Sequence, residues 1–132
     1  MSQQNIEIVR QAMDAFNRGD LESSVEPLSP NVAWHDQREL PGARVHHGPE
    51  SVLAHLRSVT DDMPDYHFEL GAVRDVGDRV MVSAVVSARG RTSGAAVKRE
   101  TFTVYTFDGG QITRVEIFGS EAEALEAAGL QQ

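Results

Sequence analysis

The feature that most constrains this chain is a change in its hydrophobic period near Tyr66. Before that point apolar residues recur every three or four positions, beginning with the series from Ile6 to Phe16, which is the spacing of one helix face. After that point apolar and polar residues alternate, as they do in strands that bury one face. Helices followed by a run of strands predict an α+β domain with helices packed on one face of a sheet.

The N-terminal segment divides into two helices at Asn17-Arg18-Gly19. This sequence is typical of a helix end, because glycine readily takes the left-handed conformation that follows the last turn. The Asp20 carboxylate can then accept a hydrogen bond from a free amide and cap a second helix. We expect that helix to run to about Leu28, since Pro30 prevents its continuation.

A strand over 32–36 and a loop over 37–47 are expected next. The loop is predicted from its proline, its glycine and its two adjacent histidines. Gly48-Pro49-Glu50 then opens a third helix, because proline fits a first turn and glutamate favours its positive end. The apolar stripe of this helix is formed by Val52, Leu56 and Val59, with His55 on the same side.

Four strands and a last helix complete the chain. The strands are expected at 66–74, 79–89, 97–107 and 111–118, and they are expected to pair as an antiparallel meander. Turn-forming sequences connect them at 76–78, 90–94 and 108–110. Ser120 and Glu123 form a capping box for a helix over 120–128, and Gly129 ends it.

The composition excludes several classes of function. Lys and Arg number 12 against 20 Asp and Glu, so the net charge is −8, which does not suit nucleic acid or an anionic membrane surface. The absence of cysteine excludes disulfides, thiolate nucleophiles and iron–sulfur clusters. No apolar run could span a membrane and no secretory signal is seen, so we expect a cytoplasmic protein. A length of 132 residues suits a single domain, 1–132.

Four segments, in this order and spacing, resemble the cone-shaped α+β fold of the nuclear transport factor 2 (NTF2) superfamily: 15–20, 32–36, 48–52 and 109–118. With its C-terminal segment 121–130, the chain most resembles the SnoaL-like, or polyketide-cyclase-like, branch. The resemblance covers essentially the whole chain. It implies about three N-terminal helices on a curved antiparallel sheet, a short C-terminal helix and a pocket. Relatives include ketosteroid isomerase, limonene-epoxide hydrolase, scytalone dehydratase and binding domains without activity, so the fold alone assigns no reaction.

Asp36 is the first candidate for a catalytic role. It shares a strand face with Trp34, while His35 takes the other face. The resemblance puts Asp36 in the place of the general base of ketosteroid isomerase, facing the pocket, where the indole would partly shield it from water. The alternative is an ordinary aspartate that begins a turn after a strand.

The resemblance also indicates what the chain lacks. The first-helix tyrosine of ketosteroid isomerase corresponds to Ala12, and its strand aspartic acid corresponds roughly to Thr103. Steroid isomerisation by that mechanism is therefore not expected. Glu116 stands where limonene-epoxide hydrolase has one aspartate of its Asp-Arg-Asp group, but the other two members correspond to Ala84 and Val86.

The last strand allows two orientations. Its alternation alone predicts that Arg114 and Glu116 face solvent, with Val115 and Ile117 in the core. The resemblance implies the reverse: Arg114, Glu116 and Phe118 would line the pocket, because the concave face of this strand does so in the family. Val115 and Ile117 would then face a second subunit, and we expect a homodimer through that face.

The histidines raise the question of a metal. His35, Asp36, His46 and His47 are residue types that bind zinc or iron. We expect no metal site, because His35 points away from Asp36 and the paired histidines belong to a solvent-facing loop. His55, on an apolar helix face, is a candidate acid or base near neutral pH; the alternative is a half-buried histidine bonded to a neighbour.

Five aromatic residues are expected to bind substrate if they converge, and are otherwise ordinary core: Phe16, Trp34, Tyr66, Tyr105 and Phe118. Lys98-Arg99-Glu100 is expected to be a solvated end of a strand.

These observations support an acid–base enzyme without a cofactor, of the cyclase, isomerase, dehydratase or hydrolase type, acting on a small hydrophobic molecule that is cyclic or contains a carbonyl group. Asp36 would move the proton, Glu116 with Arg114 would hold or protonate an oxygen, and His55 would assist. The alternatives are a non-catalytic domain that binds a small molecule or a partner, and a purely structural dimerisation module.

Overall fold

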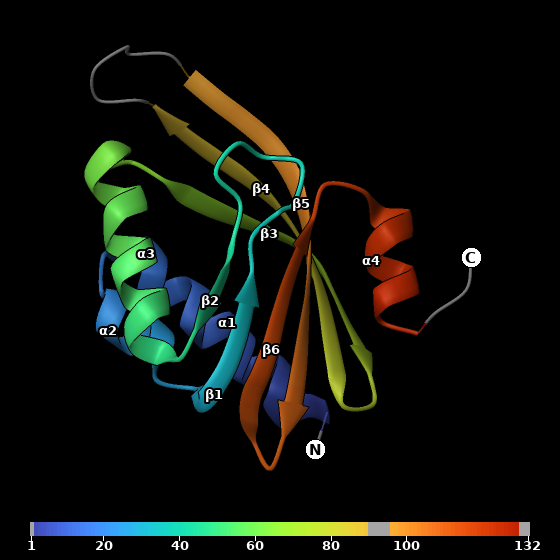
Figure 1. The fold of residues 1–132 in the computed structure, drawn as a ribbon. Coiled ribbons are helices and arrows are strands. Elements are labelled where there is room, and N and C mark those ends of the chain that lie inside the picture. Colours follow the sequence, from blue (N-terminus) through green and yellow to red (C-terminus); the bar gives the residue numbers. More distant parts are fainter. Residues whose placement is uncertain (1, 90–95, 130–132) are drawn as a thin grey trace.

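The computed structural model describes residues 2–89 and 96–129, which form four helices and six strands (Figure 1). The helices are α1 (Ser2–Asn17), α2 (Leu21–Val25), α3 (Pro49–Asp62) and α4 (Glu121–Ala127). The strands are β1 (Leu28–His35), β2 (Val45–His47), β3 (His67–Val76), β4 (Arg79–Arg89), β5 (Ala96–Asp108) and β6 (Gln111–Phe118). The predicted α+β class, with three N-terminal helices and a short C-terminal one, is confirmed. The predicted turn at 90–94 lies outside the described residues.

All six strands belong to one curved sheet in the order β2-β1-β6-β5-β4-β3. Strands β3 to β6 form the antiparallel meander that the alternating pattern predicts. The sheet is not antiparallel throughout, however, because β1 pairs with β6 in parallel. Parallel neighbours need a long connection, and the chain between β1 and β6 includes α3 and three strands of the meander.

Two predicted boundaries are wrong. The second helix ends at Val25, and Leu28 already begins β1. Pro30 lies inside that strand, where the pairing with β6 shifts register between Leu28 and Ala33; proline is tolerated at such an irregularity. The expected loop also ends early, because Val45–His47 forms the edge strand β2 and pairs with the end of β1.

The predicted helix caps and a predicted turn between strands are present in the structure. The Asp20 carboxylate accepts a hydrogen bond from the Ser23 amide at 3.2 Å and caps α2. The Ser120 hydroxyl accepts one from the Glu123 amide at 3.4 Å and caps α4. Gly109, between β5 and β6, has a φ of 60°, which favours glycine and permits the tight turn.

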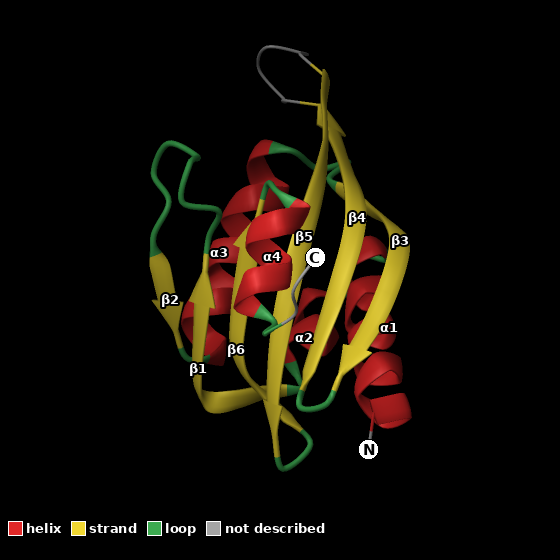
Figure 2. Ribbon diagram, turned by 90° about the vertical axis from the view of Figure 1, so that its right-hand side faces the viewer, coloured by secondary structure: helices red, strands yellow, loops and turns green. Residues whose placement is uncertain are grey.

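Different helices cover the two faces of the sheet (Figure 2). Helices α1, α2 and α3 lie over the face that we call the inner face, where Val9 of α1, Val52 of α3 and Val115 of β6 are fully buried in one apolar cluster. Helix α4 covers part of the opposite, outer face, where Leu125 packs with Phe102 in a second cluster. No helix in the described part of the chain is both long and apolar enough to span a membrane.

Asn17, the last residue of α1, attaches this helix to the edge strand β3. Its side-chain amide donates a hydrogen bond to the Phe68 carbonyl oxygen at 2.8 Å, and its side-chain oxygen accepts one from the Phe68 amide at 3.0 Å. The end of α1 is thereby held beside the strand that brings Phe68 towards Phe16.

Candidate functional site

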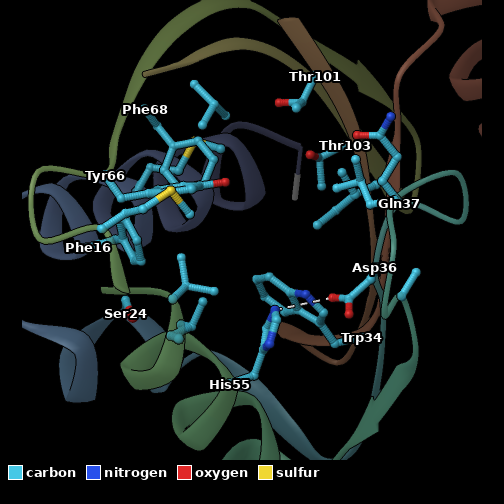
Figure 3. A pocket seen from close by; sticks show the side chains of 18 of the residues that line it. Phe16, Ser24, Trp34, Asp36, Gln37, His55, Tyr66, Phe68, Thr101 and Thr103 are labelled. Atoms are coloured by element: carbon cyan, nitrogen blue, oxygen red, sulfur yellow. Dashed lines mark ion pairs between the residues drawn. The ribbon is translucent and has the colours of Figure 1, made fainter. Parts of the chain in front are cut away.

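A cavity of about 370 Å³ lies between the helices and the inner face of the sheet (Figure 3). Apolar side chains from α1, α3 and the sheet make up most of its wall. Its polar lining includes Asp36, Gln37, His55, Arg99, Thr101 and Thr103. This volume and this mainly apolar wall with a few polar groups are typical of small-molecule sites.

Asp36, directly after β1, is the centre of the polar cluster at one side of this cavity. Its Oδ1 lies 3.2 Å from His55 Nε2, and its Oδ2 lies 3.0 Å from His46 Nε2. The Arg44 amide also donates a hydrogen bond to Oδ2, at 3.2 Å. An ionised carboxylate only accepts hydrogen bonds, so the two Nε2 atoms that face it carry protons. Nδ1 is then the nitrogen of a neutral His55 imidazole that can accept a proton.

The placement of His46 overturns a prediction. We expected a solvent-facing loop histidine, but β2 pairs His46 with Trp34 of β1, and these partners share the face on which Asp36 lies. Only 11% of the His46 side chain is exposed, against 14% for Asp36. His47, the next residue along the strand, is exposed as expected. The three-residue strand could not be distinguished from a loop by sequence pattern.

His55 reaches the cluster from α3, whose buried residues Val52 and Leu56 hold the helix against the sheet. Its ring stacks on that of His46, with centroids 4.0 Å apart and planes 23° from parallel. Burial lowers the pKa of His55 below its ordinary value; the Asp36 carboxylate opposes this shift, and His46 adds to it. His55 is therefore mainly neutral near pH 7, and its free nitrogen can accept a proton.

Asp36, His46 and His55 also form a donor set of the kind that binds transition metals. Each offers one ligand atom, and the three atoms lie within 4.8 Å of one another. Two imidazoles and a carboxylate suit zinc or iron. This set differs from the one weighed from the sequence, because His55 replaces the two exposed or outward-facing histidines.

Three polar atoms of the cavity residues are buried without a hydrogen-bond partner: Trp34 Nε1, Gln37 Oε1 and Arg99 Nε. Sequence reasoning missed Gln37 and Arg99, and it assigned Arg99 to a solvated strand end. The signal was present in the alternation of 97–107, which puts Arg99 on the same strand face as Thr101, Thr103 and Tyr105.

Four of the five expected aromatic residues line the cavity: Phe16, Trp34, Tyr66 and Tyr105. Phe16, Tyr66 and Phe68 contact one another edge to face, with ring centroids 5.1 to 5.9 Å apart. Burial raises the pKa of Tyr66, the nearby Arg99 opposes this, and the phenol keeps its proton at neutral pH. Phe118 is the exception, because it packs against the cluster under α4 on the outer face.

The expected inward orientation of the last strand is wrong. Ile117 lines the cavity and Val115 is fully buried in the inner cluster, so alternation puts Arg114, Glu116 and Phe118 on the outer face. The cause is register, since Val115 and Ile117 pair with Tyr105 and Thr103, whose side chains face the cavity. Arg114 and Glu116 form an ion pair with each other at 3.2 Å. Buried Val115 and inward Ile117 therefore cannot form the expected subunit interface.

Comparisons with solved structures find the same fold in proteins of low sequence identity. An NTF2-like protein from Burkholderia thailandensis has a TM-score of 0.81 at 22% identity, over 96% of this chain and 98% of that one. A candidate polyketide cyclase from Xanthomonas campestris has a TM-score of 0.75 at 22% identity, and TerC, co-crystallised with polyporic acid, has 0.77 at 19%. Both of these alignments also cover 96% of this chain and 98% of the other.

At these identities the structural likeness establishes the fold, which is the NTF2-like fold, and no reaction. No curated protein matches the sequence. The family model for the SnoaL-like domain, however, matches residues 9–115. This range includes the second half of α1, strands β1 to β5, and the site residues Asp36, His46 and His55. The chain belongs to the SnoaL-like domain family of NTF2-like proteins.

Proposed function

We propose that this chain catalyses proton transfer on a small hydrophobic molecule that is cyclic or contains a carbonyl group, with His55 as the base. The observation that carries the proposal is the 3.2 Å contact between Asp36 Oδ1 and His55 Nε2 at the wall of an apolar cavity. Asp36 was the base expected from the sequence. Its oxygens already accept from two imidazoles and the Arg44 amide, so we now assign it to orienting His55.

The proposed step follows from ordinary acid–base chemistry. Neutral His55 removes a proton from the carbon next to a carbonyl group, and the imidazolium that forms is stabilised by the Asp36 carboxylate. Return of the proton to another atom of the substrate completes an isomerisation. In a cyclisation the enolate carbon bonds to a second carbonyl carbon, the C=O π bond of that carbonyl opens to an alkoxide, and the alkoxide takes the proton from the His55 imidazolium. The neutral Tyr66 phenol is available as a donor to the enolate oxygen.

Membership of the SnoaL-like family and the relatives support a small-molecule substrate. One relative is a candidate polyketide cyclase, and another was crystallised with polyporic acid. A cyclic oxygenated molecule is also compatible with a cavity of about 370 Å³ that has apolar walls and a few hydroxyl and amide groups.

Deuterium incorporation into small cyclic ketones tests this proposal without knowledge of the natural substrate. In D₂O the protein should accelerate exchange at the carbon next to the carbonyl of 2-tetralone or 2-indanone, followed by proton NMR. The His55→Gln variant should lose about 100-fold or more of that acceleration. His47→Gln, which changes an exposed histidine next to His46, is the matched control and should retain it.

Two outcomes would contradict the proposal: no acceleration with any ketone, or full acceleration in the His55→Gln variant. Addition of EDTA distinguishes a free histidine base from a reaction that depends on a bound metal. If EDTA removes the acceleration and zinc restores it, the Asp36–His46–His55 set acts through a metal and His55 is not a free base.

The second candidate function is binding without catalysis. It is favoured by one observation: Glu116 and Arg114 pair with each other on the outer face, so they are unavailable as a second acid–base pair in the cavity. A binding protein would retain ligand affinity in both Asp36→Asn and His55→Gln and would exchange no proton at any pH.

We also propose that the protein is cytoplasmic and forms a homodimer. The outer face beside α4 is the candidate interface, since the inner face is occupied by the N-terminal helices. Sedimentation that detects only monomer at micromolar concentration would contradict the dimer.

A further inference from the structure

Arg99 is a cation in the cavity wall that the proposed proton transfer does not use. It lies on β5 and lines the cavity, and its Nε is buried with no hydrogen-bond partner. Within the described ranges, 2–89 and 96–129, no hydrogen bond or ion pair is found for its guanidinium. Arg99 is partly buried, and a polar N–H that is withdrawn from water without an acceptor is costly, so its unpartnered Nε indicates an acceptor that a ligand would supply.

The surroundings of Arg99 do not supply that acceptor. Its partner across the sheet is Val86, and Thr101 follows it on the same face of β5. The Tyr66 phenol is close enough for Arg99 to oppose the burial-induced rise of its pKa, but that phenol stays neutral. Asp36 is the carboxylate among the described cavity residues, and its oxygens are engaged by His46, His55 and an amide.

A second unpartnered donor belongs to another residue of the cavity wall. Trp34 Nε1 carries a hydrogen and has no acceptor, and indole N–H groups normally find one when buried. Two N–H groups without acceptors in one apolar cavity favour a ligand that has acceptor oxygens at more than one position. The unpartnered Nε of Arg99 is one of the two side-on donors that grip a carboxylate in a bidentate pair.

We propose that the cavity selects ring compounds that carry a carboxylate, and that Arg99 is the residue that selects them. This inference rests on the proposed function, because it names the substrate class of the same cavity. The carboxylate binds at Arg99, and the rest of the molecule extends along the apolar wall.

The geometry also orients the bound molecule. Figure 3 shows Thr101 and His55 on opposite sides of the cavity. Arg99 precedes Thr101 by two residues on the same strand face, so it belongs to the side away from His55. A carboxylate held by Arg99 leaves the opposite end of the ring system near His55, where proton transfer is proposed. Arg99 is thus a positioning residue for that step.

A pair of probes of nearly equal size and shape tests the inference: 2-naphthoate and 2-naphthamide, which differ in charge. Calorimetric titration at pH 7.5 should give at least about tenfold tighter binding of the naphthoate, the factor expected from one charged hydrogen-bonded contact. In Arg99→Gln the preference should fall below about threefold, because the amide keeps a donor but loses the charge. Arg99→Lys should restore part of it.

Lys98→Gln is the matched control. It removes the same charge from the adjacent residue, which is exposed on the other face of β5, and it should keep the full preference. Circular dichroism establishes that each variant is folded.

Equal affinity of the folded wild-type protein for both probes, binding of neither probe at millimolar concentration, or an undiminished preference in Arg99→Gln would overturn the inference. These results are separable from those of the exchange assay. If the protein accelerates ketone exchange but binds both probes equally, the proposed function stands and the inference about Arg99 fails. If the protein prefers the naphthoate but accelerates exchange in no ketone, it is a carboxylate-binding protein and the proposed catalysis fails.

Discussion

Among the side chains of the cavity, His55 has the charge state that matters most for the proposed chemistry. Burial lowers its pKa below 6.5, and Asp36 partly reverses this by stabilising the imidazolium. An NMR titration of the imidazole signals should therefore give a midpoint below 6.5 for His55. In Asp36→Asn the midpoint should move lower still, because the stabilising charge is gone. A midpoint at or above 6.5, or a rise in Asp36→Asn, would contradict this electrostatic description.

The sequence indicated some site residues and missed others for identifiable reasons. Asp36 follows a strand beside Trp34, and His55 lies on an apolar helix face, so both could be selected from local pattern. His46 could not be selected in this way, because its place in the site depends on the pairing of β2 with β1. Glu116 illustrates the opposite case: alternation alone indicated its outward orientation, and the family resemblance reversed that correct interpretation.

At the scale of elements, the attachment of α1 to β3 determines one wall of the cavity. The Asn17 side chain makes two hydrogen bonds with the backbone of Phe68 and joins the helix end to the sheet edge. Asn17→Ala should lower the free energy of unfolding by about 1–3 kcal/mol, because a backbone donor and acceptor lose their partners. Urea denaturation measures this change.

Gln11→Ala is the control for that prediction. Gln11 is on the exposed face of the same helix, where its contact with Glu7 is 3.5 Å long, so its replacement should change stability by less than about 0.5 kcal/mol. If Asn17→Ala is equally mild, the two hydrogen bonds do not hold the helix to the strand.

Periodicity and capping residues predicted most elements because both act locally. Asp20 and Ser120 cap the helices that they were expected to cap, and the alternating segments are strands of the meander. The errors fall where local signals are weak. Strand β2 has too few residues to establish a period, and Pro30 reads as a helix stop although it lies within a strand.

For the molecule as a whole, the two faces of one sheet have separate roles. The inner face and the N-terminal helices line the cavity, and α4 with the pair Arg114–Glu116 belongs to the outer face. The α+β class was predictable because the period changes once along the chain. The parallel pairing of β1 with β6 was not, since it joins segments far apart in the sequence, and this pairing determines which face of β6 meets the cavity.

The pH dependence of deuterium exchange into 2-tetralone, for wild-type protein and Asp36→Asn, tests the central claim most directly. If neutral His55 is the base and Asp36 orients it, the wild-type rate rises with pH through a midpoint below 6.5 and then levels off. The Asp36→Asn variant should exchange about 10-fold or more slowly at the plateau, with its midpoint shifted to lower pH. A protein-dependent rate that has no acid limb and is the same in both proteins would contradict the claim.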